Sequence, residues 1–216
     1  MTLYVEQMGQ GPDLVMVHGW GMSGAVFHSV ARELAQNFCV HLVDLPGYGY
    51  SQQTPAGLDG IIESLVTALP ARCHLLGWSL GGMLALLLAA RHPQRVQSLI
   101  TVASSPRFVA EPGWPGTKPE VLTNFAAQLM SDSHKTVDRF LAIQAMGSPT
   151  ARDDVRRLRE RVLARPEANT EALLLGLSLL CDLDLRSELQ SLTRPALHLF
   201  GRLDALVPAS VLDVWP

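Results

Sequence analysis

Residues 77–81 read GWSLG and follow the pattern G-x-S-x-G. A short apolar run precedes them, and a helix-forming run, MLALLLAARH, follows them. A sharp turn from a strand into a helix would project the hydroxyl of Ser79 above a sheet, and the glycines would let the backbones approach closely. The N–H of Leu80, at the helix start, would then stabilise an oxyanion. The alternative is a glycine-rich helix N-terminus that Ser79 merely caps.

A second turn, HGWG at residues 18–21, follows an earlier apolar run. In the same architecture this turn would supply the other oxyanion donor, the backbone N–H of Trp20. We expect His18 to stabilise the turn and not to act as a base, because it belongs to this loop.

Asp204 is the candidate acid. It follows the run ALHLF in the segment GRLD, and a carboxylate after a late strand has the place that the order Ser…Asp…His requires. Its role would be to hold an imidazole in one tautomer and to stabilise the imidazolium. The alternative is an Asx turn or a helix cap. Asp44, in the segment DLPGYG, is a weaker candidate that we expect to brace its loop.

Short apolar runs alternate with helical patterns, which predicts an α/β fold with a mostly parallel sheet and helices on both faces. Strands are expected at residues 3–7, 14–17, 40–43, 74–76, 99–102 and 196–200. HGWG, DLPGYG and GWSLGG follow the second, third and fourth of these strands. Ligand sites in such sheets lie beyond the carboxyl ends of the strands, so the three turns predict one site.

The stretch between Val102 and Ala196 contains no convincing strand, only amphipathic helices broken by Pro and Gly. Their apolar faces are Val121, Leu122, Phe125 and Leu129; Val137, Phe140 and Leu141; Val155, Leu158 and Val162; and a run over residues 171–181. We therefore predict a first core segment at 1–105, a helical cap over the sheet edge at 106–190, and an incomplete second core segment at 191–216.

Composition excludes several classes of protein. The chain has 216 residues, 48% of them apolar, and a net charge of −3, which argues against nucleic-acid binding. The N-terminus lacks a secretory signal pattern, and residues 73–90, the longest uncharged stretch, are better explained as strand, turn and helix than as a membrane span. The three cysteines form no spaced cluster. A cytoplasmic, soluble monomer without membrane contact is expected.

Together, HGWG, LVDLPGYG, GWSLGG, TVASSP (101–106) and GRLDALVP resemble the α/β-hydrolase superfamily. More narrowly, with the segment RFLAIQAMG (139–147), the chain resembles the pimeloyl-[acyl-carrier protein] methyl ester esterases of biotin synthesis. The resemblance implies a serine carboxylesterase that hydrolyses the methyl ester of pimeloyl carried by acyl carrier protein. It implies no cofactor and no metal.

By the same resemblance, Ser79 is the nucleophile, Asp204 the acid, and Trp20 and Leu80 the oxyanion and substrate-contact residues. The implied substrate-lining residues of the cap are Phe140, Leu141, Ala142, Ile143 and Gln144. Helical periodicity independently places Gln144 on the face of Val137, seven residues earlier, where a polar group would face a pocket. The alternative is a partly exposed helix edge.

The cap is locally basic. Residues 152–165 contain six arginines and three acids, a local net charge of +3. Arg152, Arg156 and Arg159 share one helical stripe, and Lys135 with Arg139 has the spacing i, i+4. The resemblance implies that Lys135, Arg139, Arg152 and Arg156 dock the acidic carrier protein. The alternative is a solvated, salt-bridged helix face.

The pattern departs from the family in one respect: the family has a histidine on a loop after the acid and one further strand. None of the seven histidines, at positions 18, 28, 41, 74, 92, 134 and 198, has this place. We expect a shortened form of a longer enzyme, with the final strand and helix missing and an apolar sheet edge exposed. Without its base Ser79 is a weak nucleophile, so the 216-residue chain itself should be nearly inactive.

Two other functions stay open. One is a generalist short-chain carboxylesterase without a carrier-protein partner. The other is a non-catalytic, hydrolase-like binding protein, since the triad histidine is absent.

Overall fold

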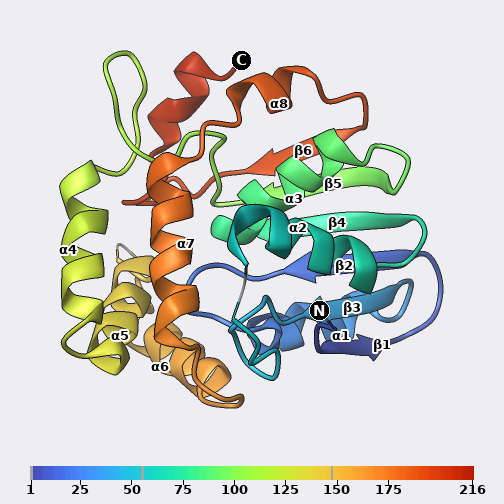
Figure 1. The fold of residues 1–216 in the computed structure, drawn as a ribbon, viewed down its shortest axis with the longest axis horizontal. Coiled ribbons are helices and arrows are strands. Elements are labelled where there is room, and N and C mark those ends of the chain that lie inside the picture. The colour runs from blue at the N-terminus through green and yellow to red at the C-terminus, as the bar shows by residue number, and fades with distance from the viewer. Residues whose placement is uncertain (1, 55, 147) are drawn as a thin grey trace.

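The fold is built on a six-stranded sheet with the strand order β1-β3-β2-β4-β5-β6 (Figure 1). A computed structural model describes residues 2–54, 56–146 and 148–216, so Gly147 of the RFLAIQAMG segment lies outside it. The edge strand β1 is antiparallel to β3, and the other pairings are parallel. The strands are β1 (Val5–Met8), β2 (Asp13–Val17), β3 (Cys39–Val43), β4 (Cys73–Trp78), β5 (Val96–Val102) and β6 (Ala196–Leu199). All six predicted strands are confirmed, with ends that differ by up to three residues.

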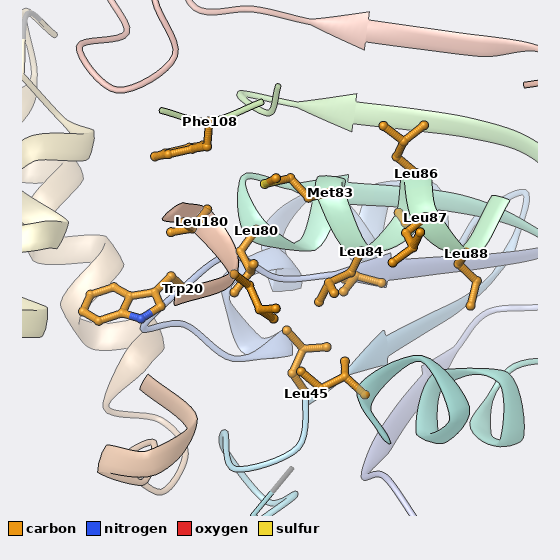
Figure 2. Close-up of a cluster of buried hydrophobic side chains, with 14 of the residues drawn as sticks. Trp20, Leu45, Leu80, Met83, Leu84, Leu86, Leu87, Leu88, Phe108 and Leu180 are labelled. Atoms are coloured by element: carbon orange, nitrogen blue, oxygen red, sulfur yellow. The ribbon is translucent and has the colours of Figure 1, made fainter. Parts of the chain in front are cut away.

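Side-chain alternation gives the sheet two apolar faces. Leu14 and Met16 of β2 point towards α1 (His28–Leu34) and the short helix η1 (Gly24–Phe27). Val15 and Val17 point to the other face, which is covered by α2 (Gly57–Ala68) and α3 (Leu80–Arg91). Helix α3 is buried along almost its whole length, and its Leu84, Leu87 and Leu88 side chains project into the core (Figure 2). This packing explains the uncharged stretch at 73–90. No helix in the described part of the chain is long and apolar enough to cross a membrane.

In the described part of the chain, five helices follow β5 and precede β6 in the sequence, whereas the two strands themselves are neighbours in the sheet (Figure 1). They are α4 (Pro119–Leu129), α5 (Ser133–Gln144), α6 (Ala151–Val162), α7 (Thr170–Asp182) and α8 (Arg186–Gln190). Helix α7 packs against both α4 and α3, whereas α8 contacts α3. The predicted helical insertion is confirmed. The exact cap boundaries, 106 and 190, stay a prediction.

Two parts of this architecture are less buried than the rest. Helix α6 has no buried side chain, and Val155, Leu158 and Val162 are only half-buried. Strand β6 is an edge strand, with Leu197 53% and Leu199 46% exposed. The expected exposed apolar sheet edge is therefore confirmed.

Candidate active site

Ser79 occupies the turn between β4 and α3. Its backbone has φ 55° and ψ −120°, a conformation that L-residues rarely adopt and that costs about 1–3 kcal/mol. The surrounding structure holds this strain: the Ser79 N–H donates to the carbonyl of Val102 (2.9 Å), and its carbonyl accepts the hydroxyl of Ser104 (2.8 Å). The hydroxyl of Ser79 has no hydrogen-bond partner in the described ranges. A strained strand-to-helix turn with an unpaired hydroxyl is the arrangement that a nucleophilic serine needs.

Glycine is required at two points beside the nucleophile. A Cβ on Gly81 would collide with the carbonyl oxygens of Val17 and His18 at the end of β2. A Cβ on Gly82 would lie 2.5 Å from the Cβ of Ser104. The start of α3 can therefore approach β2 and the loop after β5 only without these side chains.

The HGWG turn lies directly beside Ser79. A Cβ on Gly19 would be 3.2 Å from the Cβ of Ser79. The Trp20 ring is fully buried: its Nε1–H donates to the carbonyl of Leu173 (2.7 Å), and Phe140 packs edge-on against it with ring centroids 4.8 Å apart. Figure 2 shows Trp20 close to Leu80. Neither the Trp20 nor the Leu80 backbone N–H has an acceptor among the described residues, so both remain able to donate to an oxyanion.

His18 is a structural histidine of this turn. Its Nε2 accepts the backbone N–H of Leu45 (3.0 Å), and its Nδ1 lies 2.8 Å from the carbonyl of Gly19. Complete burial lowers the pKa of His18 to about 4, against the opposing effects of the Asp44 charge and the Gly19 hydrogen bond. With both nitrogens engaged, His18 is not a base for Ser79. This agrees with the role expected from the sequence.

The burial of His18 predicts a pH-dependent stability. Because the pKa of His18 is lower in the folded than in the unfolded chain, the unfolded chain binds a proton first as the pH falls. We expect the free energy of unfolding to decrease by about 3 kcal/mol from this residue between the unfolded pKa of 6.5 and the folded pKa of about 4. Denaturant unfolding across this range measures the loss. In His18→Asn this part of the pH dependence should disappear, and an unchanged slope would contradict the assignment.

Asp204 lies in a loop after β6 and is half-buried. Its Oδ1 accepts two backbone N–H groups, from Leu206 (2.8 Å) and Val207 (3.0 Å). These contacts form the Asx turn that was the alternative to a catalytic role. They leave Oδ2 without a hydrogen bond in the described part of the chain. A carboxylate fixed through one oxygen can still orient an imidazole with the other, so the two roles are compatible.

No described histidine is hydrogen-bonded to Ser79 or to Asp204. His198 lies 2.7 Å from the hydroxyl of Thr101 and packs against Trp215, and His92 follows the far end of α3. The remaining rings contact side chains elsewhere: His28 with Glu6, His41 with Asp13, His74 with Ser98, and His134 with Glu167. Among the described residues, the candidate nucleophile Ser79 and the candidate acid Asp204 therefore have no histidine bonded to either of them.

Asp44 braces its loop, as expected, but with a partner that sequence reasoning missed. Its side chain is fully buried and accepts the N–H groups of Gly24 (2.7 Å) and Tyr50 (2.9 Å). The Nη1 of Arg165 donates to the same carboxylate at 2.5 Å. Arg165 is buried, so it adds no charge to the surface of the basic segment at residues 152–165.

The predicted substrate-lining residues lie in different environments along α5. Phe140 and Leu141 are buried, Ala142 is exposed, and Ile143 is half-buried. Leu141 borders a small enclosed cavity of about 40 Å³ together with Gly21. Gln144 borders a larger open cleft of about 420 Å³, whose wall includes Trp78, the residue before the nucleophile. Ser79 is not among the residues that line this cleft, and Val137 borders the smaller cavity instead, so the role of Gln144 stays a prediction.

The predicted docking residues lie on the outer surface of α5 and α6. Lys135 and Arg156 pair with Asp132 and Asp153 of their own helix segments, and Arg139 donates to Gln128. Arg152 makes no ion pair with a described residue. Arg159, the third member of the predicted stripe, instead bridges to Asp138 of α5 (2.9 Å).

A family model described as the alpha/beta hydrolase fold matches residues 12–216. The chain is 54% identical over 211 residues to a pimeloyl-[acyl-carrier protein] methyl ester esterase of Aeromonas salmonicida, covering 96% of this chain and 83% of that protein. It is 51% identical over 212 residues to the esterase of the same name from Vibrio cholerae, covering 98% and 83%. Among solved structures, an esterase from Exiguobacterium antarcticum is similar with a TM-score of 0.85 and 24% identity, covering 99% and 82% of the two chains.

Proposed function

Because this chain belongs to the α/β-hydrolase family and, within it, to the pimeloyl-[acyl-carrier protein] methyl ester esterases, we propose that it hydrolyses the methyl ester of pimeloyl-acyl carrier protein. In the overall reaction one water is consumed, the bond between the carbonyl carbon and the methoxy oxygen breaks, and methanol and the free carboxylate are released. The observation that carries the proposal is the strained Ser79 turn beside two unpaired N–H donors.

In the proposed mechanism, the hydroxyl of Ser79 attacks the ester carbonyl. The N–H groups of Trp20 and Leu80 stabilise the oxyanion, and each such donor is worth about 10² to 10³ in kcat. Methanol leaves an acyl-serine, which water then hydrolyses. Deprotonation of Ser79 requires a histidine oriented by the free oxygen of Asp204. The residues described here supply the carboxylate for that step and not the imidazole.

The open cleft is suited to the substrate chain. Its walls combine the apolar Val26, Trp78 and Leu158 with the polar Gln144 and Arg157. An acyl chain with a polar group at each end needs this combination of surfaces. We propose that the acyl chain of the substrate enters between α6 and η1 and that Gln144 contacts one of its polar ends.

Carrier-protein docking is the finer part of the proposal and predicts a charge-dependent effect. Arg152→Glu and Arg156→Glu, singly and together, should lower kcat/KM for the carrier-bound ester by about tenfold or more at low ionic strength, because charge steering raises association rates about 10- to 10³-fold. Turnover of a small p-nitrophenyl ester should not change. High salt should shrink the difference, since it screens exposed charges.

A matched control is Arg72→Glu, which makes the same charge change on an exposed residue. Arg72 precedes β4, at the opposite end of that strand from Ser79. It should leave both substrates unaffected. If Arg72→Glu and Arg152→Glu weaken turnover of the carrier-bound ester equally, only net charge matters. If neither has an effect, the generalist short-chain esterase is the better description.

The decisive test is the activity of the protein as its own cell makes it. We expect this protein to release methanol from pimeloyl-acyl carrier protein methyl ester. Binding of that ester without turnover would favour the non-catalytic binding protein.

A further inference from the structure

Three potential metal ligands converge at the end of the sheet opposite to Ser79. They are Asp13 at the start of β2, and Cys39 and His41 at the start of β3. Cys39 and His41 are two residues apart and point to the same face of the strand, and Asp13 is paired in register with Cys39. The ligand atoms, one from each residue, all lie within 4.8 Å of one another.

One of the separations between the ligand atoms matches a tetrahedral zinc site, and a second is shorter than such a site needs. The Nε2 of His41 lies 3.5 Å from the sulfur of Cys39 and 2.7 Å from Oδ1 of Asp13. With Zn–N and Zn–O bonds of about 2.0–2.1 Å and a Zn–S bond of about 2.3 Å, a tetrahedron needs about 3.5 Å between N and S and about 3.3 Å between N and O. The first separation is already present. The second requires a shift of about 0.6 Å by Asp13, whose side chain is 35% exposed.

The hydrogen-bonding pattern also favours a bound cation. Both the carboxylate of Asp13 and the sulfur of Cys39 approach the same nitrogen of His41, which has at most one proton to give. The sulfur in addition accepts the side-chain amide of Gln7 at 2.8 Å. An electron-rich sulfur, a carboxylate and an imidazole nitrogen thus face one point. A divalent cation satisfies all three together, and its charge balances a thiolate and a carboxylate.

The site is partly accessible to solvent. Cys39 and His41 are 8% exposed, whereas the Asp13 side chain is 35% exposed and Gln7, which donates to the sulfur of Cys39, is exposed on the edge strand β1. The ligand set is one sulfur, one imidazole nitrogen and one carboxylate oxygen.

We propose that Asp13, Cys39 and His41 form a zinc site with three protein ligands, which joins β2 to β3 at the strand ends away from the nucleophile. A ligand set containing sulfur and nitrogen selects Zn²⁺ over Mg²⁺ or Ca²⁺. The alternative is a charge-assisted His41–Asp13 hydrogen bond with no metal. Because the site is at the opposite strand ends from Ser79, its existence is independent of the proposed esterase activity.

Titration of the full chain with Co²⁺ distinguishes these two arrangements. Co²⁺ bound to a thiolate gives a sulfur-to-cobalt charge-transfer band in the near ultraviolet, and tetrahedral coordination gives intense visible bands. We expect both bands. We also expect added Zn²⁺ to displace Co²⁺ and so to remove the bands, because Zn²⁺ binds such a ligand set more tightly than Co²⁺ does. Absence of the charge-transfer band in the wild-type chain would overturn the proposal.

Variants assign the bands to residues. Cys39→Ser should abolish the near-ultraviolet band, and Asp13→Asn, at a partly exposed position, should raise the Zn²⁺ dissociation constant by about 100-fold, since even outer-shell partners contribute about 10- to 100-fold. Cys181→Ser, which removes a half-buried thiol elsewhere, should retain the bands. A band that persists in Cys39→Ser or is lost in Cys181→Ser would also overturn the site.

Discussion

Ser79→Ala is expected to lower kcat/KM for both the carrier-bound ester and a p-nitrophenyl ester by about 10⁵- to 10⁶-fold in the protein as its own cell makes it, because nucleophile and base act as one unit. The residual rate should exceed that in water by about 10³ to 10⁴, owing to the oxyanion donors Trp20 and Leu80. Steady-state kinetics with the two substrates measure both quantities.

This loss is separable from unfolding. Alanine keeps the Cβ of Ser79, so the strain of the positive φ is unchanged, and the hydroxyl makes no hydrogen bond to a described residue whose removal would destabilise the fold. The thermal midpoint should therefore stay near that of the wild type. Ser64→Ala, which removes a buried hydroxyl bonded to the carbonyl of Gly60 in α2, is the matched control and should retain activity. Undiminished turnover in Ser79→Ala would refute the nucleophile.

The same substitution probes the base. When nucleophile and base act together, removing either one costs nearly as much as removing both. In the chain of residues 1–216, where no described histidine contacts Ser79, Ser79→Ala should change ester turnover by less than about tenfold. A large effect there would mean that one of the seven histidines moves into position.

Most of the sheet and the nucleophile turn could be predicted because their signals are local. Short apolar runs identify the strands, and a glycine-flanked serine between a strand and a helix identifies the turn. The chain also satisfies the steric condition behind that motif, since a side chain on Gly81 would collide with the end of β2. Local patterns of this kind depend on few residues, so they can be recognised without knowledge of the tertiary contacts.

The contacts that hold the cap to the core could not be predicted, because they join residues far apart in the sequence. Arg165 lies among exposed arginines and carries no local mark of burial, yet it pairs with Asp44, 121 positions earlier. The same holds for Phe125, which packs near both Trp20 and Phe140. Helix α6 shows the converse: its periodic apolar residues predicted a buried face, but they are only half-buried, and one of them, Leu158, lines the open cleft.

Arg165→Met should destabilise the fold by about 3–5 kcal/mol, the usual cost of leaving a buried charge without its partner. The side chain of Asp44 is fully buried, and Arg165 also contacts Glu6 and lies over the rings of Tyr4 (5.0 Å) and Tyr50 (5.7 Å). Methionine fills similar volume but supplies no charge. Denaturant unfolding at neutral pH measures the loss.

A double-mutant cycle separates the ion pair from packing. Asp44→Asn removes the buried charge, so Arg165→Met should cost about 0.5–3 kcal/mol less in that background than in the wild type. Arg156→Met, which breaks the exposed pair with Asp153, is the matched control and should cost at most about 1 kcal/mol. Equal costs for Arg165→Met in both backgrounds would mean that packing alone holds Arg165.

Glu6 adds a second pH dependence of the folding stability, which arises from its charged partners and not, as for His18, from burial. Burial raises its pKa, but the hydrogen bond and charge of His28 and the guanidinium of Arg165 outweigh this and hold the pKa below the ordinary 4.5. A lowered carboxyl pKa stabilises the fold above the unfolded pKa, and this contribution is lost as the pH falls through the folded pKa. Without Arg165 one cause of the lowering disappears. The acid-induced loss of stability from Glu6 should therefore be smaller in Arg165→Met than in the wild type.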